Sequence, residues 1–104
     1  MSGQNWSIMI TTGGFVVDAF GQSGSALQAQ NGDVISWNNQ TDQQHQPWQT
    51  DSSYNPTGPQ LSNVIDAWKS STPGYVPATA STPSTIYYYC KNHPSEHGTI
   101  VVVA

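Results

Sequence analysis

The sequence is poor in charge and in cysteine. Its 104 residues include two lysines, no arginine, one glutamate and one cysteine, and the formal net charge is −4. Two cations cannot neutralise a run of phosphates, so we expect no nucleic-acid binding. The same shortage argues against binding to an anionic membrane surface. One cysteine cannot form an internal disulfide, which excludes a small fold held together by disulfide bonds.

Long apolar runs are also absent. The longest, residues 100–104, is far shorter than the ~20 residues of a membrane-spanning helix, so we expect no membrane insertion. Residues 1–4 lack the basic and apolar regions of a signal peptide, and they leave open whether the protein is exported. The length fits one domain, and we predict a single domain over residues 1–104.

The residues that are present indicate a folded β protein rather than disorder, because aromatic and β-branched side chains are frequent. Short segments in which apolar residues alternate predict strands. They lie at residues 5–11 and 33–38, and segments with strand-forming residues predict further strands at 14–20, 85–90 and 99–103. A short segment at residues 26–30 precedes the turn pair at residues 31–32. Glycine-rich turn signals separate several of them, at residues 13–14, 21–24 and 31–32. This rhythm predicts an all-β fold, a Greek-key sandwich or barrel.

Residues 49–84 are rich in proline and predict a long irregular stretch. The prolines there are Pro56, Pro59, Pro73, Pro77 and Pro83. Because proline cannot donate to a β-ladder, we expect no central strand in this stretch. Apolar residues recur at helical spacing over residues 61–69, which predicts a short helix.

The segment that carries chemistry begins at the only cysteine. Cys90 ends a predicted strand, and His93, Glu96 and His97 follow it on a predicted loop. The third histidine, His45, lies in a turn after an earlier strand. In a sandwich, two such loops can meet at one end of the sheets. One thiolate and two imidazoles converging there would form a trigonal site of the type associated with copper electron transfer.

These segments resemble a known family. The run YYYCKNHPSEHG at residues 87–98, followed by a valine-rich strand, is similar to the copper loop of the cupredoxins, closest to amicyanin, plastocyanin and pseudoazurin. The run GDVISWNN at residues 32–39, followed by His45, resembles the segment that bears their first histidine. The resemblance does not extend to residues 49–84. It implies a cupredoxin-type β-sandwich with one type 1 copper ion.

Position by position, the resemblance implies His45, Cys90 and His93 as the three equatorial copper ligands. Where the family carries an axial methionine, this chain has Glu96, and His97 follows it. We predict Glu96 as the fourth ligand, with His97 as the alternative, and a three-coordinate or water-closed site also stays open. A hard donor favours Cu(II), so we expect a low reduction potential and a green or red colour, with some similarity to nitrosocyanin.

The residues around these ligands suggest a supporting shell. By analogy with cupredoxins, Asn38 or Asn39 would tie the ligand loops together through hydrogen bonds. Trp48 and the prolines that follow two of the histidines would surround the metal with apolar groups, which limits water access and tunes the potential.

The predicted function is therefore that of a monomeric one-electron carrier that is not an enzyme and that serves unidentified redox partner proteins. The family resemblance implies a periplasmic or extracellular location. Alternatives stay open. The copper could bind a small exogenous ligand or perform redox catalysis, the protein could carry or sense copper, or the site could hold zinc or no metal. Cysteine–histidine nucleophilic catalysis is disfavoured, because nothing in the sequence indicates a cleft for it.

Overall fold

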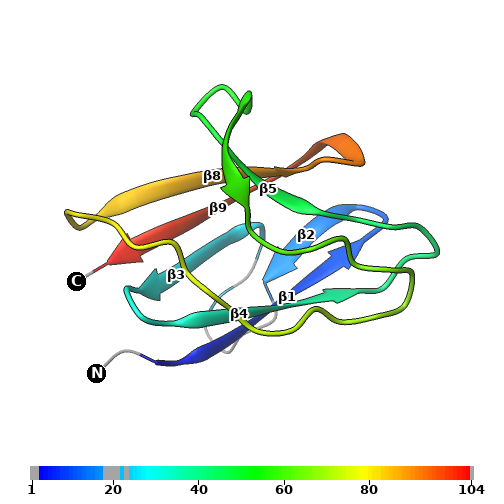
Figure 1. The fold of residues 1–104 in the computed structure, drawn as a ribbon, viewed down its shortest axis with the longest axis horizontal. Coiled ribbons are helices and arrows are strands. Elements are labelled where there is room, and N and C mark those ends of the chain that lie inside the picture. The colour runs from blue at the N-terminus through cyan, green and yellow to red at the C-terminus, as the bar shows by residue number, and fades with distance from the viewer. Residues whose placement is uncertain (1–2, 18–21, 23, 104) are drawn as a thin grey trace.

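The computed structural model describes residues 3–17, 22 and 24–103, and these form nine β-strands and no helix. The strands are β1 (Asn5–Thr11), β2 (Gly14–Val17), β3 (Ala26–Gln30), β4 (Val34–Asn39), β5 (Pro47–Thr50), β6 (Pro56–Gln60), β7 (Gly74–Tyr75), β8 (Ser84–Cys90) and β9 (His93–Val103). One sheet has the order β2-β1-β4-β7 and the other the order β3-β9-β8-β5-β6. Figure 1 shows the two layers, with β8 and β9 in one and β1 and β4 in the other. The predicted all-β sandwich is confirmed.

The core lies between the two sheets. Phe15 of β2, Trp37 of β4 and Tyr88 of β8 pack their rings edge to face, with centroids 4.8–5.8 Å apart. Such pairs contribute about 0.5–1.5 kcal/mol each beyond the burial of their area. Gly98 lies opposite Tyr88 in the β8–β9 pair, and a Cβ atom there would clash with the Tyr88 ring and hydroxyl. Glycine at this position therefore leaves room for the large ring.

Most strand predictions agree with the structure to within a residue or two. The predicted strand at residues 14–20 is present as Gly14–Val17, and residues 18–20 lie outside the described residues. The predicted turn at residues 21–24 lies partly outside them as well.

The stretch 49–84 is more regular than we expected. The end of β5 and the whole of β6 and β7 fall within it, and β5 lies between β8 and β6, which makes it an inner strand. The prolines are compatible with an edge strand although not with a central one, so they do not make the stretch irregular as predicted. Pro56 and Pro59 both belong to β6, which forms the edge of its sheet, where one side of the strand needs no ladder donors.

The helix predicted at residues 61–69 is wrong. Ile65 pairs with His45 instead, through His45 N–H donating to Ile65 O at 3.1 Å and Ile65 N–H donating to His45 O at 2.8 Å. This extended pairing uses the backbone groups that a helix would need. Val64 and Trp68 are exposed, at 47% and 68%, so the apolar helical face that the spacing suggested does not exist. No helix among the described residues is long and apolar enough to cross a membrane.

Candidate metal centre

Four side chains from three segments meet at one end of the sandwich. Cys90 ends β8, His93 and Glu96 lie in the first part of β9, and His45 lies between β4 and β5. One donor atom from each of the four lies within 4.8 Å of the others. Cys90 and His45 are buried, and the other two are half-buried. The residues that the sequence singled out are thus brought together, except for His97.

The Cys90–His97 segment is a tight hairpin rather than the loop that we predicted. β9 already begins at His93, with a two-residue turn between it and Cys90. In the ladder, Cys90 pairs with His93 and Tyr89 pairs with His97, so residues 94–96 bulge out of register. A bulge redirects the side chains of its strand and interrupts the pairing. Here it allows both His93 and Glu96 to reach the same cluster.

Strand parity explains why Glu96 faces inward and His97 outward. The buried residues of β9 are Gly98, Ile100 and Val102, and Glu96 continues this alternation by two. His97 has the opposite parity and is exposed. Side chains of a strand alternate between its two faces. Counting this alternation back from Val102 to residues 96 and 97 could therefore have shown from the sequence that Glu96 faces inward and His97 outward.

The separations between the donor atoms fit a single metal ion. Cys90 Sγ lies 3.3 Å from His45 Nδ1 and 3.6 Å from His93 Nδ1. The two imidazole rings stack with centroids 4.3 Å apart. For metal–ligand bonds of about 2.0–2.3 Å, donors at tetrahedral angles stand about 3.5 Å apart. The cluster therefore has the size that one ion requires.

Both imidazoles present an unprotonated Nδ1 to the cluster. His93 Nε2 lies 2.6 Å from Gln43 Oε1, an oxygen that only accepts, so Nε2 carries the proton. His45 Nε2 lies 2.8 Å from Thr41 Oγ1, and that hydroxyl also lies within reach of two accepting oxygens. This pattern favours donation from His45 Nε2 to Thr41. A histidine that ligates a metal usually donates its second N–H in this way.

A buried asparagine holds the His45 segment in place. The Asn39 side-chain amide donates to the backbone oxygens of Gln43, Ile65 and Asp66, at 2.7, 3.2 and 3.1 Å. Its Oδ1 accepts from the backbone N–H and the hydroxyl of Thr41. Asn39 therefore connects the His45 segment to residues 65–66. Among the described residues it makes no hydrogen bond to the cysteine hairpin, so the predicted tie between the two ligand loops is found on the His45 side only.

Glu96 is the least satisfied group of the cluster. Its Oε1 is buried and makes no hydrogen bond, although it lies 3.2 Å from His45 Nδ1. Burial raises the pKa of Glu96, partly opposed by the neighbouring His93. Burial, together with the neighbouring His93, lowers the pKa of His45, which disfavours the imidazolium that would pair with the carboxylate. An unpaired buried oxygen beside a bare nitrogen and a thiol is costly, and a cation among them would satisfy all three.

Cys90 is inaccessible to solvent. Burial raises the pKa of its thiol, opposed by backbone hydrogen bonds from Gln46, Asn92 and His93, and the nearby Glu96 raises it further. Metal binding would therefore displace a proton from sulfur. A buried thiol with a raised pKa is a poor nucleophile.

His97 has partners outside the cluster. Its Nε2 donates to Pro94 O at 2.9 Å, and its ring stacks on Tyr54 with centroids 3.8 Å apart and planes 3° apart. Tyr54 has a left-handed backbone with φ 61° and also contacts Tyr87 edge-on. These contacts hold the outer side of the bulge.

Apolar groups flank the cysteine on its other side. Pro47 is buried and pairs with Cys90, and Trp48 pairs with Tyr89 on the neighbouring strands. Lys91 Nζ lies 4.8 Å from the centroid of the Trp48 ring. Trp48 is thus at the metal end of the sheet, as expected, and is half-buried there.

The fold is similar to those of solved copper proteins. A reduced Cu(I) form of a proline-to-glycine variant of amicyanin aligns with a TM-score of 0.66 and 16% identity, over 98% of this chain and 85% of that one. A purple cupredoxin from Nitrosopumilus maritimus aligns with a TM-score of 0.70 and 20% identity, over 92% of this chain and 97% of that one. The chain has the cupredoxin fold. No protein-family profile and no curated protein matches the sequence.

On this cupredoxin fold, the donor set points to one copper ion. A soft thiolate suits Cu(I), imidazoles suit Cu(II), and a site that offers both accommodates either state. The orphaned Glu96 oxygen and the approach of both Nδ1 atoms to one sulfur are the observations on this chain that a metal ion would explain.

Proposed function

We propose that this protein binds one copper ion through His45, Cys90 and His93 and carries single electrons between redox proteins. The observation that supports this is the arrangement of two bare Nδ1 atoms at 3.3 and 3.6 Å from one sulfur, each ring held by a second hydrogen bond. Copper bound there would supply one-electron chemistry. The contribution of the chain is to keep the donors in one geometry in both oxidation states.

The ligand segments are suited to this task because they differ in accessibility. The buried His45 is held by Thr41, within the network of Asn39. The half-buried His93 contacts Gln43 on the exposed side of the site. His93 therefore offers the shorter route for an electron to a docked partner. With two lysines in the chain, a docking surface here would depend little on charge, so we expect the affinity for a partner to vary weakly with salt.

We further propose Glu96 as the fourth ligand. Its buried Oε1 lies beside His45 Nδ1 without any hydrogen bond, which leaves its lone pairs available. A carboxylate is a harder donor than a thioether and favours Cu(II), so the potential should be low and the colour green or red. We propose that the protein is a monomer without enzymatic activity, located in the periplasm or outside the cell.

Spectroscopy tests the copper site directly. Titration with Cu(II) should give an intense visible band that saturates at one ion per chain, with a matching paramagnetic-resonance signal. Cys90→Ala should abolish the band. His97→Gln is the control, because it alters a histidine outside the cluster and should retain the band. A colourless complex of the unaltered chain would contradict the proposal, and tighter binding of Zn(II) without colour would favour a structural metal.

Electrochemistry separates a carrier from a storage protein. A carrier should show a reversible one-electron wave and fast self-exchange, since its ligands keep their positions. An irreversible wave with loss of copper on reduction would instead favour the alternative of a copper carrier or sensor.

A further inference from the structure

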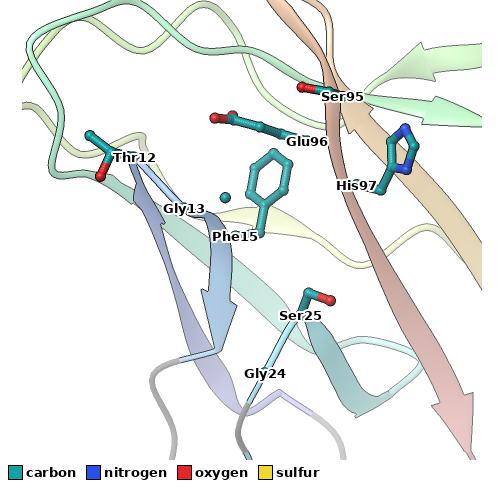
Figure 2. A pocket seen from close by; sticks show the side chains of 9 residues that line it. Thr12, Gly13, Phe15, Gly24, Ser25, Ser95, Glu96 and His97 are labelled. Atoms are coloured by element: carbon teal, nitrogen blue, oxygen red, sulfur yellow. The ribbon is translucent and has the colours of Figure 1, made fainter.

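A cleft of about 490 Å³ opens beside the metal cluster. Figure 2 shows the turn between β1 and β2 on one side, with Thr12, Gly13 and Phe15, and the bulge of β9 on the other, with Ser95 and Glu96. Ser25 and its neighbour Gly24 line the end of the cleft away from Glu96.

Glu96 belongs to both the cleft and the metal cluster. It lines the cleft, its side chain is 15% exposed, and its buried Oε1 reaches within 3.2 Å of His45 Nδ1. Behind it, His45 and Cys90 are almost fully buried. Of the four residues of the cluster, Glu96 is the one that lines the cleft, so a small molecule that enters it meets this carboxylate.

Nothing in the described structure holds the Glu96 carboxylate oxygen Oε1 in place by hydrogen bonding. Glu96 also lies in the bulge of residues 94–96, outside the regular pairing of β8 with β9. Movement of this side chain would therefore break no ladder hydrogen bond and would leave no protein donor unpaired. By contrast, displacing His45 would break its contact with Thr41 and disturb the network of Asn39.

The lining of the cleft determines which ligands it suits. Thr12, Ser25 and Ser95 contribute hydroxyls, Phe15 contributes an apolar ring, and Glu96 contributes a carboxylate. No lysine lines the cleft, and the ring of His97 at its rim is stacked on Tyr54. With Cu(II) bound, its two positive charges would be balanced by the Cys90 thiolate and the Glu96 carboxylate, so the site has no net charge to attract an anion and to offset the cost of removing water from it. An uncharged molecule that accepts or donates hydrogen bonds does not meet this barrier.

From this geometry we infer that the cleft admits a small uncharged ligand with a lone pair to the metal, where it exchanges with the carboxylate of Glu96. This inference rests on the proposed function, because it requires a copper ion at the cluster. It extends that function in three ways. An external ligand would reach the fourth ligand position of the metal through the cleft, it would replace the carboxylate of Glu96 there, and uncharged ligands would bind more tightly than anions.

Titration of the copper-loaded protein with two probes tests the preference. Imidazole at about pH 8, where it is mostly uncharged, should shift the visible band in a saturable manner and change the paramagnetic-resonance signal. Azide, a small anion, should need about tenfold higher concentration for half-saturation. In Glu96→Gln, which removes the charge but keeps the size, this gap should close. Azide that binds the unaltered protein as tightly as imidazole would overturn the charge argument.

Variants that narrow the cleft test the route. A Cβ atom at Gly13 would meet only Thr11 Oγ1, at 3.7 Å, so Gly13→Phe is compatible with the fold. Ser25→Phe narrows the cleft from another wall. Each should weaken imidazole binding by about tenfold while the copper band itself is unchanged. Ser81→Phe, an exposed serine just before β8 at the end opposite Cys90, is the matched control and should bind imidazole like the unaltered chain.

The outcomes distinguish this inference from the proposed function. If the unaltered protein shows no copper–thiolate band, the proposed function fails. If the band forms but imidazole does not shift it, or if both wall variants bind imidazole as well as Ser81→Phe does, the function stands and the cleft is not the route. If either Gly13→Phe or Ser25→Phe loses the copper–thiolate band, the other variant of the pair is used to test whether the cleft is the route.

Discussion

Two carboxylates of this protein, Asp33 and Glu96, occupy opposite ends of the sandwich in opposite surroundings. Asp33 is 2% exposed and lies just before β4. It accepts four hydrogen bonds, from the backbone N–H groups of Gly3, Gln4 and Gln30 and from the indole N–H of Trp6, at 2.8–3.0 Å. Glu96 has a buried oxygen with no hydrogen bond at all.

The pKa directions follow from this difference. Burial acts to raise the pKa of Asp33, but its hydrogen bonds outweigh burial and lower the pKa below the usual value. For Glu96, burial prevails and the pKa is raised. A carboxylate whose lone pairs are used by donors of the same chain holds the fold together. One whose lone pairs are free among imidazole and sulfur is available to a cation.

Of the substitutions at the two carboxylates, Asp33→Asn should have the largest effect on the stability of the fold. The substitution places an NH₂ group or a weaker acceptor opposite four N–H donors, and we expect the free energy of unfolding to fall by about 3 kcal/mol. Urea denaturation followed by fluorescence measures it. Asp42→Asn, at an exposed position, is the control and should change stability by less than about 0.5 kcal/mol. Equal losses for the two variants would contradict a special role for Asp33.

Acid should distinguish the two carboxylates as well. The folded pKa of Asp33 is lowered, so its stabilising contribution is present above the unfolded value of 3.8 and is lost as the pH falls through the folded pKa. The unaltered protein should therefore lose stability on the acid side of 3.8, and Asp33→Asn should lose less over the same range. Denaturation curves at a series of acidic pH values test this, and parallel profiles for the two proteins would count against it.

Glu96→Met should affect the metal rather than the fold. A thioether in place of a carboxylate stabilises Cu(I), and a change of about 10- to 100-fold in the relative affinity for Cu(I) raises the potential by roughly 60–120 mV. The visible band should move toward blue. Voltammetry and absorption measure both effects. An unchanged potential would rule out Glu96 as a ligand.

Glu96→Gln should stabilise the metal-free protein, in contrast to Asp33→Asn. Removing a buried charge without a partner relieves a desolvation cost, and we expect a gain of about 1 kcal/mol at neutral pH. Thermal unfolding in the presence of a chelator measures the gain. With copper bound, the order of the two proteins should reverse, since the unaltered carboxylate would then be coordinated. A loss of stability without metal would show that Glu96 is already satisfied.

Tyr54→Leu should have the smallest effect. The Tyr54 ring covers His97 on the outer side of the bulge, and its loss should cost about 0.5–1 kcal/mol. It should also speed amide hydrogen exchange at residues 95–97 more than elsewhere. Tyr75→Leu, on a residue 79% exposed, is the control. Uniform exchange rates in the two variants would show that the stack does not hold the bulge.

Local patterns predicted a large part of this architecture. Alternation of apolar residues located β1 and β4, because a half-buried strand requires period two whatever its neighbours are, and a run of strand-forming residues located β8. The same reasoning failed at residues 61–69, where Leu61, Val64 and Ile65 fit a helical face. Helical spacing carries no information about the pairing of Ile65 with His45, which involves residues twenty positions apart.

In the metal cluster too, some features follow from local sequence and others depend on the tertiary structure. The spacing of Cys90 and His93 is local, and a tight hairpin brings both into one cluster. The approach of His45 to Cys90 depends on the stacking of two sheets. The alternation of side chains along β9 predicts that Glu96 faces inward. This prediction could be made only once β9 was known to begin before the bulge.

The sequence by itself therefore determined that the chain is all-β and which side chains are chemically equipped to hold a metal, because both depend on residue type and short spacing. Only the tertiary structure decided that Glu96 faces the cluster without a hydrogen bond, while Asp33 is saturated with donors. The reason is physical. A buried carboxylate receives hydrogen bonds from N–H groups that belong to segments far away in the chain. Only the packing of those segments in the folded protein determines whether their N–H groups lie within hydrogen-bonding distance of the carboxylate.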